Sequence, residues 1–230
     1  MRFGLNLILL SLIALVCTTV RADPIGGTSN TNCFKNSCQG STYTLSYSGT
    51  PIASDAASST YRIFYDIDTS TYTGGGSYID NVAIKVSNAF ISASIVGAPD
   101  GTANWNEING GLNSGGCSGS GSGWICGDGL GNGGKGVAVG GLLEWVFDVT
   151  VSNTTSLLLD VPTSADCTTC SSIKARYVDS SDAKVGNLVS EPITLQVPEP
   201  KTLALVGLGM VLIGLGRKRL STIMLRSKSK

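Results

Sequence analysis

The sequence of 230 residues contains no histidine, and only 14% of its residues carry a charge. Without an imidazole base, the chain cannot build a Ser-His-Asp or Cys-His hydrolytic site. The usual Cys/His zinc sites are excluded as well, which leaves only all-cysteine or carboxylate ligands for a metal. No basic face is found outside the last turns of the chain, so we expect no nucleic-acid partner.

The net charge of zero hides two regions of opposite sign. Between Asp23 and Gln196 there are 7 basic and 15 acidic residues, a balance of −8. After Gly216 there are six basic residues and no acidic one. An acidic body followed by a basic tail is the charge asymmetry of a chain that meets a membrane near its end.

Residues 1–22 have the features of a secretory signal peptide. Arg2 supplies the positive charge, and an apolar run over residues 5–16 follows it. The segment Val20-Arg21-Ala22 favours cleavage before Asp23, because it offers suitable residues at the two positions that signal peptidases read. An uncleaved anchor is the alternative, but the run is short for a membrane span and ends in a good cleavage site.

The C-terminal end combines three short segments. Pro198-Glu199-Pro200 comes first, an apolar run of 14 residues over 203–216 follows, and the cationic cluster Arg217-Lys218-Arg219 comes last. As a helix, the apolar run would span about 21 Å, which is short of a hydrocarbon core of about 30 Å. The cationic cluster would stay cytoplasmic and leave the acidic body outside the membrane.

These segments, in this order, resemble the PEP-CTERM sorting signal, the C-terminal tag of exosortase substrates in Gram-negative bacteria. The resemblance covers residues 197–219 and implies that an exosortase recognises Pro198-Glu199-Pro200, with Arg217-Lys218-Arg219 as the basic stop cluster. It also implies a precursor anchored transiently in the inner membrane, and then a protein at the cell surface or in the extracellular matrix. Residues 220–230 extend the chain beyond the usual end of the signal as a basic tail.

Parts of the body carry a broader resemblance to a recurrent type of PEP-CTERM surface protein. They are residues 72–78 with 82–86, 110–117 with 124–126, and 172–177 with 190–194. This resemblance implies no catalysis, and it implies a link to exopolysaccharide and the biofilm matrix.

Residues 23–196, the expected exported domain, show the two-residue periodicity of β-strands and almost no helical periodicity. Apolar side chains alternate with others at 61–68, 82–86, 143–151 and 173–178, and further strands are expected at 42–47, 90–96, 156–161 and 192–197. About eight strands separated by Gly, Ser, Asn and Asp turns predict an all-β fold, an antiparallel β-sandwich of jelly-roll-like type.

Residues 101–141 break the alternation, because they hold 16 of the 30 glycines. A loop of this length is uncommon in a compact domain, so we expect it to be functional or flexible, with short strands at 123–126 and 136–139. Trp105 and Trp124 lie in this region. Exposed rings would stack on the sugars of an exopolysaccharide, whereas buried rings would cap the core. The second interpretation is favoured, since large aromatic side chains are mostly buried.

Six cysteines remain after removal of the signal peptide, an even number that favours disulfides in an exported chain. They form three close pairs, so the simplest pairing is local: Cys33–Cys38, Cys117–Cys126 and Cys167–Cys170. A redox-active Cys-x-x-Cys at 167–170 is disfavoured, because it lies between strand-like segments rather than at a helix N-terminus. An all-cysteine metal site is disfavoured because exported thiols oxidise.

The carboxylates show no catalytic pattern. A glycosidase needs two carboxylates spaced across a sugar, and nothing in the sequence pairs Glu107, Glu144 or Glu191. Asp66 and Asp68 begin a calcium-loop pattern, but the glycine and glutamate that complete it are missing, which favours a simple turn. We therefore expect no catalytic residue, no metal and no cofactor. The first hypothesis is a non-enzymatic surface or biofilm-matrix protein sorted by exosortase, and the alternative is an exopolysaccharide-binding module.

Overall fold

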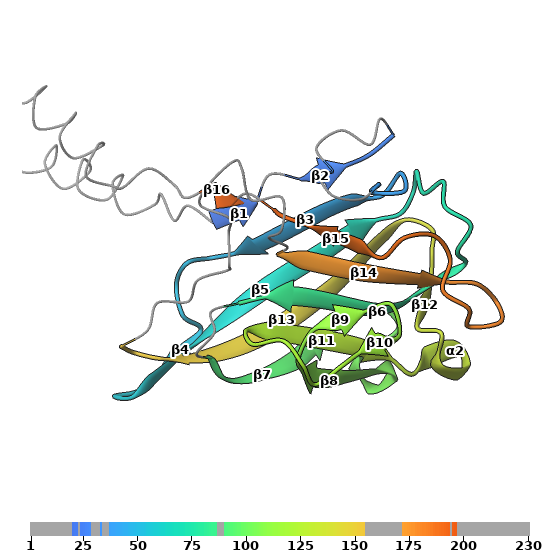
Figure 1. Cartoon of the computed structure of the whole chain (residues 1–230). Helices are drawn as coiled ribbons and strands as arrows, with labels where there is room; N and C mark the ends of the chain where they lie inside the picture. Colours follow the sequence, from blue (N-terminus) through green and yellow to red (C-terminus); the bar gives the residue numbers. More distant parts are fainter. Residues whose placement is uncertain are drawn as a thin grey trace, which may run out of the picture. The chain divides into compact units, whose positions relative to one another are not determined.

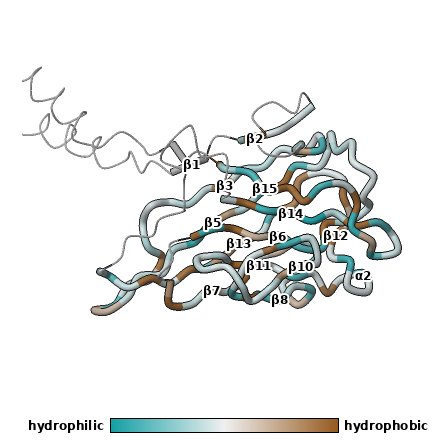
Figure 2. Tube along the Cα trace, viewed as in Figure 1, coloured by the Kyte–Doolittle hydropathy of each residue, from teal (hydrophilic) through white to brown (hydrophobic). Residues whose placement is uncertain are grey.

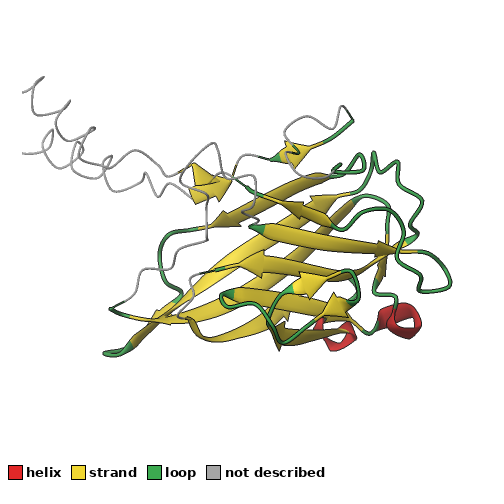
Figure 3. Ribbon diagram, viewed as in Figure 1, coloured by secondary structure: helices red, strands yellow, loops and turns green. Residues whose placement is uncertain are grey.

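The computed structural model describes residues 20–22, 24–28, 33, 37–86, 90–154, 172–193 and 195–196. They belong to the unit Met1–Gln196, and their regular secondary structure is almost entirely β-strand, joined by loops and turns (Figure 3). The exceptions are two single turns of helix, η1 (Thr102–Asn104) and α2 (Gly131–Gly134). In this described part of the chain, no helix has the length and apolar character needed to cross a membrane.

The first of two large antiparallel sheets contains eight strands (Figure 1). Their order is β16-β1-β3-β5-β13-β7, with β2 paired to β3 and β4 paired to β5. The long strands β5 and β13 pair over their full lengths and form its centre. The bounds are Val20–Ala22 (β1), Ile25–Gly26 (β2), Thr42–Tyr47 (β3), Ala53–Ser54 (β4), Ser58–Asp68 (β5), Phe90–Gly97 (β7), Leu142–Ser152 (β13) and Leu195–Gln196 (β16).

The second sheet contains six strands in the order β15-β14-β6-β11-β8, and β12 pairs with β6 beside this path. Two further strands, β9 and β10, form a small separate sheet. The bounds are Tyr78–Lys85 (β6), Trp105–Asn109 (β8), Leu112–Asn113 (β9), Gly116–Cys117 (β10), Trp124–Gly129 (β11), Val137–Ala138 (β12), Ile173–Val178 (β14) and Val189–Glu191 (β15).

The two large sheets share one hydrophobic core. Successive side chains of a strand point to opposite faces, so every second one points inward. Figure 2 shows hydrophobic residues, in brown, recurring along the strands of both sheets. At the centre, Trp145 of the first sheet and Trp105 of the second meet edge to face, with ring centroids 5.2 Å apart. The inward residues include Tyr43, Leu45, Ile63, Tyr65, Ile67, Phe147 and Val149 from the first sheet, and Ile79, Val82, Ile84, Ile125, Ile173, Ala175 and Tyr177 from the second.

The chain crosses repeatedly between the sheets. The connections β5–β6, β6–β7, β7–β8, β12–β13 and β13–β14 each join a strand of one sheet to a strand of the other, whereas β14 and β15 are neighbours within one sheet. The predicted all-β, antiparallel architecture is therefore confirmed. The jelly-roll-like type within that class stays a prediction.

Strands with clear alternation lie where the sequence predicts them, as β3, β5, β7, β13 and β14 show. The strand expected at 192–197 is present only as the short β16, and the one expected at 156–161 lies outside the described residues. Strand β15 has no periodic pattern in the sequence, because its three residues are all buried and therefore do not alternate.

The glycine-rich region 101–141 was expected to be a long loop, but it supplies β8 to β12. Of these, β11 and β12 lie where short strands were expected, at 123–126 and 136–139. Two of these, β8 and β11, are neighbours in the second sheet. The glycines permit backbones to pack directly against each other. A Cβ atom at Gly136, where φ is +72°, would clash with the carbonyl oxygen of Ile79, and one at Gly110 would clash with that of Ser118.

Buried tyrosines join the two sheets through their hydroxyl groups. The hydroxyl of Tyr177 lies 2.8 Å from that of Tyr43 and 2.9 Å from the Oγ of Ser41. The ring of Tyr177 also stacks on Tyr72, with centroids 4.5 Å apart. Burial raises the pKa of Tyr177 well above its usual range, so this hydroxyl stays protonated as a hydrogen-bonding group.

We predict that Tyr177→Phe lowers the free energy of unfolding by about 1–3 kcal/mol, because it leaves two buried hydroxyl groups short of a partner. Urea unfolding of the two proteins measures the difference. Tyr61→Phe removes a hydroxyl from a half-buried ring and is the matched control, with an expected change within about 0.5 kcal/mol. Equal losses in the two variants would contradict the role given to Tyr177.

Candidate functional site

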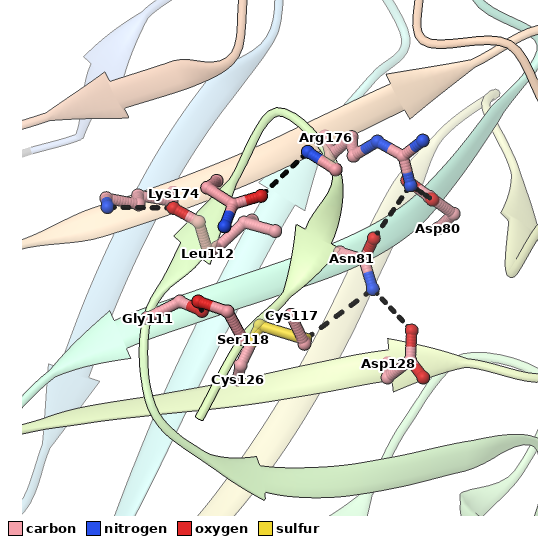
Figure 4. The surroundings of a disulfide bond; sticks show 12 residues. Asp80, Asn81, Gly111, Leu112, Cys117, Ser118, Cys126, Asp128, Lys174 and Arg176 are labelled. Atoms are coloured by element: carbon pink, nitrogen blue, oxygen red, sulfur yellow. Dashed lines mark hydrogen bonds and ion pairs between the residues drawn. A yellow bond between two sulfur atoms is a disulfide. The ribbon is translucent and has the colours of Figure 1, made fainter. Parts of the chain in front are cut away.

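Residues 110–123 cover the outer face of the second sheet, and we call this segment the clamped loop. It contains β9 and β10, and the Cys117–Cys126 disulfide joins it to β11 (Figure 4). Leu112 of the loop and Trp124 of β11 pack together in a second, smaller hydrophobic cluster. Strand β6 is therefore buried on both faces, by the main core on one side and by this cluster on the other.

Lys174 of β14 holds the clamped loop from the neighbouring strand. Its Nζ donates a hydrogen bond of 2.9 Å to the carbonyl oxygen of Leu112 and lies 4.4 Å from the centre of the Trp124 ring. A cation over an indole face is attracted by the negative charge of the ring's π-system. The ammonium group thus ties the loop backbone to β14 and β11.

A polar network lies beside the disulfide (Figure 4). Arg176 of β14 forms an ion pair with Asp80 of β6, and its Nη1 also donates to the Oδ1 of Asn81 over 3.2 Å. The Nδ2 of Asn81 donates to the Oδ1 of Asp128 over 2.6 Å and to the Sγ of Cys117 over 3.5 Å. The network therefore connects β14, β6 and β11 with the clamped loop.

Asp80 is the most strongly perturbed carboxyl of this network. Its side chain is only 4% exposed. Burial raises the pKa of Asp80 to about 7, because the loss of solvation outweighs the attraction of Arg176. Carboxyls that titrate near neutrality occur among general acids, but a substrate would have to reach this one. Because Asp80 is closed to solvent and held by Arg176, we assign it a structural role.

Both tryptophans considered for sugar stacking are buried. Trp105 is 6% exposed, packs in the main core and donates from its Nε1 to the carbonyl oxygen of Pro99 over 3.0 Å. Trp124 is 9% exposed and packs against the clamped loop. Burial at both positions favours the interpretation that these rings cap the core over that of an exposed platform for sugars.

Two of the three predicted disulfides are present in the described residues. Cys33 is bonded to Cys38, and Cys117 is bonded to Cys126. The second bond closes a loop with a sequence separation of 9 and links the loop to a strand that is itself buried in the sheet. Cys167 and Cys170 lie outside the described residues, so their pairing stays a prediction.

The three glutamates considered for glycoside hydrolysis lie on separate strands. Glu107 is on β8 and Glu191 on β15, at opposite ends of the second sheet, while Glu144 is exposed on β13 of the first sheet. No facing pair of the kind that glycosidases use forms among them. Asp68 accepts a hydrogen bond from the Ser70 backbone, as a turn residue does. Within the described ranges, no group of three metal-ligating side chains comes together.

The sorting residues Pro198-Glu199-Pro200, the basic cluster Arg217-Lys218-Arg219 and the tail 220–230 lie outside the described residues. A family model of the PEP-CTERM protein-sorting motif matches residues 196–219. The chain therefore carries a PEP-CTERM motif, which indicates an exported protein that an exosortase sorts. In Gram-negative bacteria, such a motif implies a membrane-anchored precursor that is processed to the cell surface. Among curated proteins and among solved structures, no match to the chain is found.

The structure also joins the two ends of the body, a contact that sequence reasoning missed. Strand β1, at residues 20–22, lies inside the predicted signal peptide and pairs with both β3 and β16. Arg21 lies opposite Gln196, the first residue of the matched motif. The residues before the predicted cleavage site are thus paired with those at the start of the matched motif, and no local sequence pattern could have indicated this.

We predict that the double change Cys117→Ser and Cys126→Ser lowers the free energy of unfolding by about 2–3 kcal/mol, the loop-closure value for a ring of this length. The freed loop should also uncover Trp124, which acrylamide quenching of tryptophan fluorescence detects. The matched change at Cys33 and Cys38 should leave the quenching unchanged. Quenching that stays low in the first variant would show that the disulfide does not hold the loop.

We predict that the free energy of unfolding falls as the pH rises from about 4 to about 7. In this range the folded chain keeps the proton of Asp80, while the unfolded chain, with an ordinary pKa of 3.8, has lost it. Because the chain has no histidine, the other side chains that titrate in this range are carboxyls, mostly at its acidic end, and burial also raises the pKa of Glu107.

Thermal unfolding between pH 4 and pH 8 measures this dependence. Asp80→Asn mimics the protonated carboxyl and should flatten the curve, whereas Glu144→Gln removes an exposed carboxylate and should not. A wild-type melting temperature that rises over this range would contradict the assignment to Asp80.

Proposed function

We propose that the chain is a non-enzymatic surface protein, whose all-β body is displayed at the cell surface or in the extracellular matrix after exosortase processing. One observation carries the proposal. The matched sorting motif begins at Gln196, the last residue of β16, so the signal directly follows the end of the body. Because the sorting motif begins where the folded body ends, the body can be carried to the cell surface as one folded unit ahead of the signal.

The polar groups of the body support a structural role rather than catalysis. The best-connected cluster, around Asp80 and Arg176, is nearly closed to solvent, and it fastens the clamped loop to the sheet. On the first sheet, Arg62 donates twice to Asp148 across neighbouring strands. The functional groups in both places bond to other side chains of the same domain.

The sorting step follows from the chemistry of the C-terminal segments. The apolar run 203–216 would enter the membrane, and Arg217-Lys218-Arg219 would stay on the cytoplasmic side, which places the PEP motif at the outer interface. Pro198 and Pro200 favour extended backbone and prevent a helix from growing outward. Glu199 is then presented to a membrane-embedded protease on an extended segment.

The alternative, an exopolysaccharide-binding module, rested on Trp105 and Trp124. Both rings are buried, and the remaining tryptophan, Trp145, lies fully inside the core. A tryptophan platform for sugars is therefore unsupported, and we retain the display function alone.

We predict that an epitope tag placed after Lys230 is lost from the mature protein in a host with an active exosortase. Changing Pro198, Glu199 and Pro200 to Ala should trap a tagged form in the membrane fraction, because the protease loses its recognition residues. Immunoblots of membrane and surface fractions with antibodies to the tag and to the body measure this.

Two controls make the result specific. Pro192→Ala changes a proline close to the motif but outside it, and the tag should still be lost. A host without exosortase should retain the tag on the unchanged protein. If tag and body stay together while exosortase is active, the chain is a plain tail-anchored protein.

A further inference from the structure

The sequence contains two Asn-Gly dipeptides, Asn109-Gly110 and Asn132-Gly133. Asparagine is a chemically labile residue, and it loses its side-chain amide most readily before glycine. In this reaction the backbone nitrogen of the glycine attacks the amide carbon of the asparagine, and glycine has no Cβ atom to hinder the approach. The two dipeptides share this local chemistry, so the fold decides which of them reacts.

The first dipeptide is locked in the second sheet. Asn109 ends β8 and pairs with Ile125 of β11. The N–H of Gly110, whose nitrogen is the nucleophile, donates to the carbonyl oxygen of Trp124 over 2.9 Å. Gly110 is buried, and a Cβ atom there would lie 2.1 Å from the carbonyl oxygen of Ser118 in the clamped loop. Reaction at this site therefore requires local opening of both the sheet and the loop.

The second dipeptide lies in the turn α2 and is exposed. Asn132 and Gly133 both have left-handed backbone, with φ of +53° and +74°. A Cβ atom at Gly133 or Gly134 would meet nothing within 4 Å apart from its chain neighbours, so solvent surrounds this part of the turn. In the described part of the chain, no acceptor is found for the Gly133 N–H. The nucleophilic nitrogen is therefore open, and rotation of its peptide group displaces no packed residue.

A side-chain hydrogen bond restrains Asn132. Its Nδ2 donates to the carbonyl oxygen of Gly136 over 2.6 Å. The bond uses the nitrogen that leaves in the reaction and does not involve the nucleophile. The backbone bond that closes the turn, from the N–H of Gly136 to the carbonyl oxygen of Gly131, also leaves the peptide group between Asn132 and Gly133 unused. The turn can therefore rearrange at this peptide while the strands on either side stay paired.

We propose that Asn132 is a site of spontaneous deamidation in the folded protein, and that the sheet and the clamped loop protect Asn109. The Gly133 nitrogen loses its proton to water and bonds to Cγ of Asn132, the Cγ–Nδ2 bond breaks, and ammonia leaves a succinimide ring. Water then opens the ring at either carbonyl and gives aspartate or isoaspartate. The product carboxylate cannot donate to Gly136, so the restraint on the turn is lost. The reaction needs only water, so it can be tested apart from exosortase sorting and display.

The test is incubation of the purified, folded protein at mildly alkaline pH, followed by digestion at acidic pH, where deamidation is slow. Tandem mass spectrometry should locate the replacement of NH2 by OH at Asn132, with isoaspartate among the products, because the succinimide gives both isomers. Asn109 should react at least about tenfold more slowly, since a tenfold difference requires only about 1.4 kcal/mol for local opening. Asn132→Gln should abolish most of the ammonia release, because its longer side chain would need a six-membered ring. Asn109→Gln is the matched control and should leave the release unchanged.

Unfolding separates the effect of the fold from that of the sequence. In urea, with the disulfides reduced, Asn109 and Asn132 should react at similar rates, because both glycine nitrogens are then free. Four outcomes would overturn the proposal: an Asn109 that reacts as fast as Asn132 in the folded protein, an Asn132 that reacts only in urea, a difference between the sites that persists in urea, or a product without isoaspartate.

Discussion

Strand β6 is buried on both faces, and much of the domain depends on this constraint. One face packs on the first sheet through Ile79, Val82 and Ile84. The other would be open to water if the clamped loop did not cover it, and the loop contributes Leu112 and Cys117 to the small cluster around Trp124 of β11. The disulfide, the Lys174 contacts and the Arg176 network all fasten the loop where the hydrophobic contribution alone is small. The second sheet is stabilised by this polar and covalent layer as well as by its core.

The composition of the loop explains why it needs a covalent bond. Glycine loses more backbone freedom on folding than any other residue, so a glycine-rich cover is entropically costly to order. Glycine is nevertheless required at Gly110, where a side chain would clash with the carbonyl oxygen of Ser118. The Cys117–Cys126 disulfide offsets part of this entropy by restricting the unfolded chain. Because such bonds persist in oxidising compartments, this fold suits an exported protein.

Sequence reasoning located those features that a local pattern encodes. β5 and β13 were predictable because one face is buried and the other is not, so apolar and polar residues alternate. β11 was only partly predicted, because its glycines interrupt the alternation of apolar and polar residues. β15 was missed, because all three of its residues are buried and it shows no alternation. The PEP motif is a linear signal and could be read directly. The Asp80–Arg176 pair joins residues 96 apart in sequence, and its formation depends on the register between β6 and β14.

The pairing of β1 with β16 connects the predicted signal peptide with the start of the PEP-CTERM match. Backbone groups in a β-ladder are occupied, whereas a protease usually needs an extended and unpaired segment to bind. Cleavage before Asp23 would remove Val20–Ala22 together with the signal peptide, and with them the strand that pairs with Leu195 and Gln196. Among the described strands, β16 pairs with β1 alone. Removal of the signal peptide would therefore free the backbone immediately before the sorting motif, which gives a physical reason for N-terminal processing to precede C-terminal sorting.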